Sequence, residues 1–186
     1  AGLKTLLVEK KKLGGVCLNE GCVPSKTLLQ AAKTYHHAKH GSVFGVTVEG
    51  LNFDFPKAHS HKNGVMDKMR AGIAGLMKKY KIDVVDGEAI LKPNRKIEVN
   101  GEEHEADNIL ICTGSSPAVP PIPGIEQEHV VDSTGILERE SLPHRLIVVG
   151  GGVIGCEFAC MFASVDVPVT VLEAMPEICP NLDGEI

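Results

Sequence analysis

The sequence predicts an α/β fold, in which short buried strands alternate with amphipathic helices. Residues 146–149 and 167–172 are aliphatic runs, and a glycine-rich turn follows the first of them. Apolar residues recur at helical spacing over residues 24–39 and 56–81. The composition, 43% hydrophobic and 23% charged, is that of an ordinary globular chain and argues against disorder.

The first part of the chain opens with a predicted strand over residues 3–9, followed by a polar turn and the pair Gly14-Gly15. The helix over residues 24–39 comes next. Its Pro24 suits the first helical turn, where the missing N–H costs little. The second helix follows an irregular stretch.

Three short runs after the second helix predict an antiparallel meander that leads into one buried strand. These runs cover residues 82–85, 96–99 and 108–111. Asn100-Gly101 is a strong signal for a tight turn between strands.

Charge and cysteine content exclude several classes of protein. A formal charge of −5 makes nucleic acid and anionic membranes poor partners. No apolar run approaches the roughly 18 residues of a membrane span, and no secretory pattern is present, so we expect a cytoplasmic protein. The chain is too long and too aliphatic for a disulfide scaffold. Four cysteines are expected to be buried, reduced thiols: Cys112, Cys156, Cys160 and Cys179.

The motif Gly150-x-Gly152-x-x-Gly155 stands between a predicted strand and a predicted helix, and a second strand then delivers Glu173. In this context the glycines permit a tight turn and let backbone N–H groups approach a pyrophosphate. The Glu173 carboxylate would accept hydrogen bonds from ribose hydroxyls and would repel a 2′-phosphate, which favours NAD over NADP. A glycine turn without any ligand is the alternative. Asp166, where a glycine often ends the helix, tolerates the left-handed conformation that this turn needs.

Cys17 and Cys22 lie on either side of Gly21, just before the first predicted helix. An ideal helix would separate their Cα atoms by roughly 8–9 Å. A disulfide tolerates less than about 7 Å, so a bonded pair requires a distorted or pre-helical turn. The helix N-terminus and Lys26 would both stabilise a thiolate, which suits reversible thiol chemistry. A zinc half-site or two unrelated thiols stay open as alternatives.

Three motifs together resemble the pyridine nucleotide–disulfide oxidoreductases: GGVCLNEGCVPSK at residues 14–26, ICTGS at residues 111–115, and residues 150–157. Their order and spacing match that family over the whole chain. Ser25, where the glutathione-reductase branch usually has Lys, gives the greatest similarity to the branch that oxidises dihydrolipoamide. The mercuric-reductase branch stays open.

The resemblance implies two Rossmann-like domains. Residues 1–142 would be an FAD-binding domain that carries the meander and lacks its first glycine turn, and residues 143–186 would begin an NAD-binding domain. The chain would then be an internal piece of a longer protein. By itself it is expected to be inactive, because the family's catalytic base would lie elsewhere.

The resemblance also implies a role for each matching residue. Cys17 and Cys22 would form a redox disulfide, with a substrate dithiol attacking Cys17 and Cys22 passing electrons to FAD and on to NAD⁺. Residues expected to bind FAD are Glu9, Lys10, Gly14, Gly15, Val16, Lys26, Ala89, Thr113 and Gly114. Residues expected to bind NAD are Gly150, Gly152, Gly155, Glu157 and Glu173. No metal site is expected.

The intact protein is expected to be a homodimer that oxidises a protein-bound dihydrolipoyl group. Its partner would be the lipoyl-bearing acyltransferase of a 2-oxoacid dehydrogenase complex or a glycine cleavage carrier. Two alternatives are another disulfide reductase of the same family, mercuric- or glutathione-reductase-like, and a non-catalytic thiol or zinc module.

Overall fold

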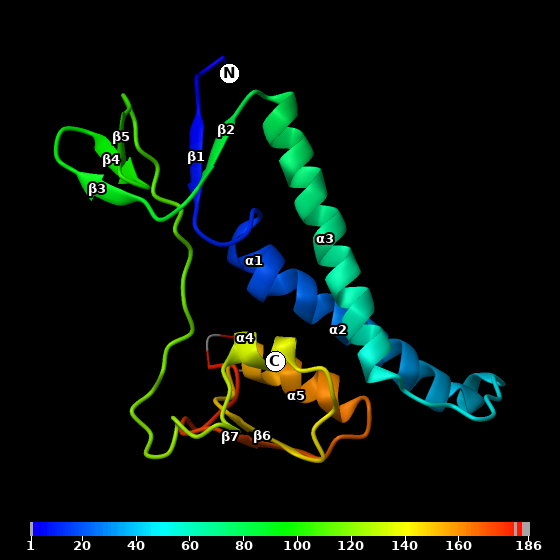
Figure 1. Ribbon diagram of the computed structural model, residues 1–186. Coiled ribbons are helices and arrows are strands. Elements are labelled where there is room, and N and C mark those ends of the chain that lie inside the picture. Colours follow the sequence, from blue (N-terminus) through cyan, green and yellow to red (C-terminus); the bar gives the residue numbers. More distant parts are fainter. Residues whose placement is uncertain (1, 181, 184–186) are drawn as a thin grey trace. The chain divides into compact units, whose positions relative to one another are not determined.

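The computed structural model describes residues 2–180, 182 and 183, and confirms the predicted α/β class (Figure 1). The chain forms two compact units. The first combines Ala1–Asn19 with Met66–Ser116, and the second combines Glu20–Val65 with Pro117–Ile186. This division follows the packing of the chain, so the motif-based boundary between residues 142 and 143 stays a prediction.

Two parallel strands form the base of the first unit. β1 (Leu6–Glu9) pairs with β2 (Asp83–Asp86), and the Gly87 N–H extends the ladder by donating to the Glu9 carbonyl at 2.9 Å. A parallel pair needs a long crossover between its strands, and the helices between β1 and β2 provide it. This pairing corrects the prediction that residues 82–85 belong to the antiparallel meander. The local pattern fits either sheet, because it does not identify the partner strand.

The antiparallel meander follows β2 in Figure 1. It consists of β3 (Ile90–Lys92), β4 (Lys96–Val99) and β5 (Glu102–Glu105). Asn100 and Gly101 join β4 to β5 with φ of 53° and 82°, as expected of a tight hairpin turn. The predicted turn is confirmed, and β4 covers the predicted run at residues 96–99.

The prediction of a buried strand over residues 108–111 is wrong. The segment forms no strand, and Leu110 and Ile111 are 87% and 63% exposed. An aliphatic run becomes a buried strand only beside another strand that shares its hydrogen bonds. Among the described residues, no strand pairs with residues 108–111.

A second parallel pair organises the other unit. β6 (Leu146–Val149) pairs with β7 (Val169–Leu172), and α5 (Val153–Ala163) connects them. Figure 1 shows α5 lying along this pair. Asp166, in the turn from α5 to β7, has the predicted left-handed backbone with φ of 67°. Its carboxylate accepts hydrogen bonds from Tyr35 Oη at 2.9 Å and Lys39 Nζ at 2.5 Å, which fastens the turn to α2.

The core of the second unit lies where α5 packs on α2 (Cys22–Lys39). Leu28 and Ala32 of α2 are buried against apolar residues from other parts of the chain, which the local sequence does not identify as their partners. The remaining members of this core are Phe55, Ile136, Leu137, Phe158, Met161, Phe162, Val165 and Val167. Burial of such side chains contributes about 1.5–3 kcal/mol each, so this cluster fixes α5 and α2 relative to each other.

Four further helices complete the described structure: α1 (Gly15–Glu20), the 3-10 helix η1 (Gly41–Phe44), α3 (Phe55–Lys79) and α4 (Ser133–Glu138). The Asp132 side chain caps α4 by accepting the N–H groups of Thr134 and Gly135. Buried Lys62 of α3 donates to the Leu137 carbonyl near the other end of α4 at 2.5 Å. No helix in the described part of the chain is long and apolar enough to cross a bilayer.

Candidate functional site

The turn from β1 into α1 passes through two exposed glycines with left-handed backbones. Gly14 has φ of 113° and Gly15 has φ of 68°. A Cβ at Gly14 would lie 2.6 Å from Leu18 Cδ1, and the left-handed φ disfavours any side chain, so the turn favours glycine here. This geometry keeps the loop backbone open to solvent at the start of α1, where an anionic group would find N–H donors.

Asn19 fastens this loop from the inside. Its Nδ2 donates to the carbonyls of Lys12, Leu13 and Gly15 at 3.2, 3.2 and 3.0 Å. Arg70 of α3 then donates from Nη1 to Asn19 Oδ1 at 2.9 Å. Neither residue was predicted as part of the site. The position of Asn19, four residues after Gly15 on a short helix, is a usable signal, whereas nothing local identifies Arg70.

The ends of β1 and β2 are followed by residues predicted to bind FAD. Glu9 accepts the Lys11 N–H at 2.9 Å, which holds its carboxylate over the turn. Lys10 Nζ lies 2.9 Å from Glu88 Oε1 and, through that hydrogen bond, lowers the pKa of Glu88. Ala89 follows as an exposed residue after β2. The structure therefore places these residues at the carboxyl ends of the two neighbouring parallel strands.

Thr113-Gly114 lies beside the same loop. Gly114 has φ of 74°, and a Cβ on it would lie 2.7 Å from Val16 Cγ2. Two motifs that are far apart in the sequence therefore meet, and glycine is required where they touch. Thr113 is exposed at this point.

Cys17 and Cys22 flank a break between two helices. Cys17 lies in α1, and Cys22 is the first residue of α2, after Gly21 with φ of −143° and ψ of −111°. Ser25 secures the break, because its Oγ donates to the Gly21 carbonyl at 2.8 Å. Both cysteines are exposed. The helical interruption that a bonded pair requires is confirmed, as is the position of Cys22 at a helix N-terminus.

Lys26 and Glu157 form an ion pair. Lys26 Nζ lies 2.6 Å and 2.8 Å from the two carboxylate oxygens of Glu157, so α2 is joined to α5 through charged groups as well as through the core. From the sequence, Lys26 was expected to bind FAD and Glu157 to bind NAD, and the contact between them was not predicted. A pocket of about 530 Å³ borders Lys26, and it is lined by Val23, Lys26, Thr27, Gln30, Ala31, Thr34, His61 and Val65.

The second glycine loop joins β6 to α5. Gly150 has φ of 107°, and a Cβ on Gly155 would lie 2.1 Å from the Gly150 carbonyl oxygen, so α5 can begin here only with glycine. Gly152 caps α5, no side chain caps that end, and the space around Gly152 is open. The N–H groups of the first helical turn are thus available for an anion.

Glu173 follows β7 and turns toward this loop. Its Oε2 accepts the Gly151 N–H at 2.6 Å, and its Oε1 accepts the Met175 N–H at 2.7 Å. Hydrogen bonds from the Met175 and Gly151 backbones lower the pKa of Glu173, so the carboxylate stays charged at neutral pH. The predicted acid is therefore beside the glycine loop.

The prediction that four cysteines are buried is wrong. Cys112 and Cys160 are exposed, while Cys156 and Cys179 are half-buried. Cys112 lies in the segment that does not form a strand, and Cys160 lies on the face of α5 opposite the core. Cys156 Sγ and Cys179 Sγ are 3.6 Å apart, a proximity that the sequence did not reveal. In the described part of the chain, no group of three metal-ligating side chains is assembled.

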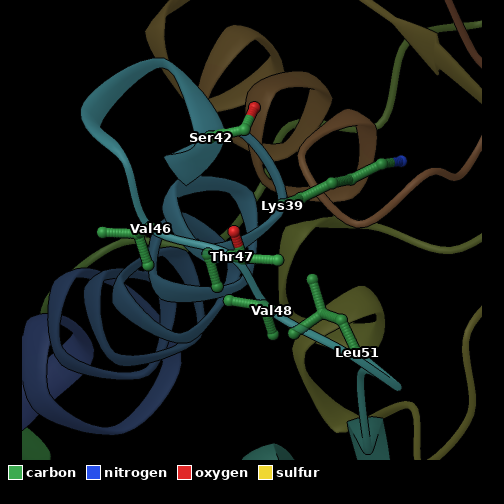
Figure 2. Close-up of a pocket in the computed structure, with 7 residues that line it drawn as sticks. Lys39, Ser42, Val46, Thr47, Val48 and Leu51 are labelled. Carbon is green, nitrogen blue, oxygen red and sulfur yellow. The ribbon is translucent and has the colours of Figure 1, made fainter.

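One further pocket lies away from all predicted site residues. Figure 2 shows it at the end of α2 and in the segment that follows. Its volume is about 220 Å³. Its charged side chain, Lys39, already pairs with Asp166. Its lining is Ala38, Lys39, Ser42, Val46, Thr47, Val48 and Leu51, which includes no carboxylate, histidine or cysteine.

A parallel strand that enters a glycine turn and a helix, with an acid on the next strand, defines a nucleotide-binding α/β protein, and the exposed cysteines at a helix start add redox chemistry to that class. The family model of the pyridine nucleotide-disulphide oxidoreductases matches residues 1–186. The chain belongs to this family.

The similar proteins agree with that assignment. The chain is 43% identical to a dihydrolipoyl dehydrogenase of Acholeplasma laidlawii, covering 100% of this chain and 56% of that protein. It is 44% identical to a dihydrolipoyl dehydrogenase of Thermus scotoductus, covering 99% and 40%. The chain therefore spans about half the length, or less, of these relatives.

A solved structure with the same fold is the Cu(II) complex of the HOCl-induced flavoprotein disulfide reductase RclA of Escherichia coli. The TM-score is 0.84 at 38% identity, and the match covers 100% of this chain and 40% of the other. LpdA of Mycobacterium tuberculosis matches with a TM-score of 0.80 at 26% identity, over 94% and 39% of the two chains. The fold, including both glycine loops, is thus that of flavoprotein disulfide reductases.

Proposed function

We propose that the whole protein oxidises a protein-bound dihydrolipoyl group and transfers the electrons through Cys17 and Cys22 to FAD and then to NAD⁺. The observation that carries this proposal is the pair of exposed cysteines at the break between α1 and α2, directly after the Gly14-Gly15 loop. A dithiol substrate would attack Cys17, its second thiol would close the substrate disulfide, and the two enzyme thiols would be left reduced.

FAD is proposed at the first glycine loop. The exposed Gly14-Gly15 backbone, the adjoining Gly114 and the Glu9 carboxylate form a set of donors and acceptors that fits a dinucleotide. The full proposed set is Glu9, Lys10, Gly14, Gly15, Val16, Lys26, Ala89, Thr113 and Gly114. When bound, the flavin would supply the two-electron chemistry that links thiols to a nicotinamide. The chain's own task is to present Cys22 at the N-terminus of α2.

NAD⁺ is proposed at the second glycine loop. The uncapped start of α5 and the open space at Gly152 fit a pyrophosphate, and the Glu173 carboxylate fits ribose hydroxyls. The full proposed set is Gly150, Gly152, Gly155, Glu157 and Glu173. Lys26, assigned to the flavin, forms an ion pair with Glu157, assigned to the nicotinamide, within the second unit.

The proposed partner is the lipoyl-bearing acyltransferase of a 2-oxoacid dehydrogenase complex or a glycine cleavage carrier, and the proposed working form is a homodimer in the cytoplasm. A reducing compartment suits a disulfide that opens and closes in each turnover. The names of the dihydrolipoyl dehydrogenase relatives support this choice of substrate.

A second candidate within the family is reduction of a different substrate. RclA, a disulfide reductase of another kind, matches the whole chain with a TM-score of 0.84. The shared fold therefore does not by itself select the substrate.

The test is steady-state oxidation of dihydrolipoamide by the whole protein with NAD⁺ as acceptor. We expect turnover in the wild type and at least a thousandfold loss in Cys17→Ser and Cys22→Ser, because each removes one sulfur of the exchanging pair. Cys160→Ser, an exposed cysteine on α5, is the matched control and should retain activity. Faster turnover with glutathione disulfide or mercuric ion would select the other branches. A colourless protein with stoichiometric zinc would overturn the redox assignment.

A further inference from the structure

The segment that follows β7 folds back onto the second glycine loop. The Cys179 N–H donates to the Gly151 carbonyl at 2.7 Å, while the Gly151 N–H donates to Glu173 Oε2 at 2.6 Å. A Cβ on Gly151 would lie 2.9 Å from Ile178 Cγ2, so the contact is close. One glycine of the nucleotide loop is therefore held at both backbone polar groups by the segment that begins at Glu173.

Two thiols meet at this contact. Cys156, in the first turn of α5, has its Sγ 3.6 Å from Cys179 Sγ and donates to the Gly151 carbonyl at 3.2 Å. Both thiols are half-buried, and the Gly151 carbonyl accepts from the Cys156 thiol and from the Cys179 backbone N–H. A disulfide requires a sulfur separation of about 2.0 Å, so the two atoms need to approach by roughly 1.5 Å. Small side-chain rotations can provide such a shift.

We propose that Cys156 and Cys179 form a second, reversible disulfide on two-electron oxidation, and that this bond fastens the segment after β7 onto the glycine loop and weakens NAD⁺ binding there. The consequence for NAD⁺ rests on the proposed function of this loop, whereas formation of the bond does not. The site is distinct from Cys17 and Cys22, which lie in α1 and α2.

The chemistry balances with a peroxide as oxidant. One thiolate attacks the peroxide O–O bond, forms a sulfenic acid and releases hydroxide, which takes up the thiol proton as water. The second thiolate then attacks that sulfur, the S–S bond forms, and a second water leaves. Two thiols and one hydrogen peroxide thus give one disulfide and two waters, and an external dithiol reverses the step.

The hydrogen bond with Cys179, together with burial, raises the pKa of Cys156. Either sulfur can be oxidised first, because the other lies 3.6 Å away and can resolve the sulfenic acid.

The effect on NAD⁺ follows from the hydrogen bonds of Glu173. The Gly151 N–H already donates to Glu173, so a pyrophosphate can take up this N–H only if that hydrogen bond lengthens. With the thiols reduced, the segment is held here by hydrogen bonds that can exchange for ligand contacts. A disulfide from α5 to Cys179 would prevent that movement.

The first test locates the bond. The whole protein is treated with hydrogen peroxide, remaining thiols are alkylated, and the peptides are identified by mass spectrometry. We expect one linked species that contains Cys156 and Cys179 and disappears after dithiothreitol. Cys160→Ser should retain it, while Cys156→Ser and Cys179→Ser should each lose it. The proposal would be overturned if Cys156 and Cys179 were both alkylated after a treatment that oxidises Cys17 and Cys22. A link between Cys156 and Cys160 would overturn it as well.

The second test measures NAD⁺ affinity by calorimetry before and after peroxide. We expect roughly tenfold weaker binding after oxidation in the wild type and in Cys160→Ser, and no change in Cys179→Ser. Equal affinity in both states would overturn the effect on NAD⁺ while leaving the proposed function intact. Absence of NAD⁺ binding to the reduced protein would instead refute the proposed role of the loop, and the linked peptide would still decide whether the disulfide forms.

Discussion

Each glycine loop leads from a parallel strand into a helix, but side chains hold the two loops through opposite kinds of backbone group. In the first, the Asn19 amide donates to three loop carbonyls, so the loop is anchored through its acceptors. In the second, the Glu173 carboxylate accepts from the Gly151 N–H, so the loop is anchored through a donor. Only the second anchor occupies a group that a bound pyrophosphate or ribose would itself need.

This difference matches a difference in proposed ligand. A loop whose carbonyls are held internally keeps its N–H groups ready, which suits a cofactor that stays bound. A loop whose N–H is held by an exchangeable carboxylate suits a dinucleotide that binds and leaves in each turnover. The comparison therefore makes separate predictions for the two loops.

The largest effect is expected for Gly155→Ala. Its Cβ would lie 2.1 Å from the Gly150 carbonyl oxygen, and neither backbone segment can move freely. We expect a loss of about 1–3 kcal/mol in the free energy of unfolding, measured with denaturant, and loss of NAD⁺ binding with flavin content retained.

Gly152→Ala is the matched control, because its added Cβ meets no atom within 4 Å. Its free energy of unfolding should change by no more than about 0.5 kcal/mol, although its NAD⁺ affinity should fall. Equal destabilisation by the two substitutions would remove close packing as the reason for Gly155.

Asn19→Ala should break the first loop alone. It removes three donated hydrogen bonds and leaves Arg70 without this acceptor, which should cost about 1–3 kcal/mol in the free energy of unfolding. Flavin content, read from absorbance, should fall while NAD⁺ affinity stays constant. Asn63→Ala, on the exposed face of α3, should change neither quantity. A fall in NAD⁺ affinity equal to the fall in flavin content would show that the loops are not independent.

Glu173→Gln should weaken the second loop alone, with about tenfold lower NAD⁺ affinity and less discrimination against NADP⁺. Because backbone hydrogen bonds lower the folded-state pKa of Glu173 below 4.5, its charge contributes stability above that pH. That contribution is lost as the pH falls through the lower folded-state value. Unfolding measured from pH 7 to pH 3 should show this component in the wild type and not in the variant; identical profiles would contradict the hydrogen bonds to Gly151 and Met175.

The smallest effect on stability is expected for Lys26→Gln. The Lys26–Glu157 pair is partly exposed, so its loss should change the free energy of unfolding by about 0–1 kcal/mol. The turnover rate should fall clearly even though the free energy of unfolding hardly changes, because the pair joins residues proposed to bind the two cofactors. Unchanged turnover with unchanged stability would leave the pair without a role in the reaction.

The sequence predicted features that depend on neighbouring residues. The helix break at Gly21, the turn at Asn100-Gly101, the left-handed Asp166 and the position of Glu173 after a strand each follow from local backbone preferences. These features carry most of the candidate site.

Features that depend on distant partners were missed. The pairing of β2 with β1, the failure of residues 108–111 to form a strand, the Arg70–Asn19 hydrogen bond and the approach of Cys179 to Cys156 all depend on tertiary placement. Hydrophobic pattern and propensity do not contain that information.

The most direct measurement of the central claim is the visible spectrum of the whole protein during anaerobic titration with a dithiol. We predict a yellow protein that gains a long-wavelength absorption band after uptake of two electrons, because reduced Cys22 would interact with a bound flavin. Cys22→Ser should remain yellow and lack the band. The same band in Cys22→Ser, or a wild-type protein that takes up electrons without any such band, would contradict the account.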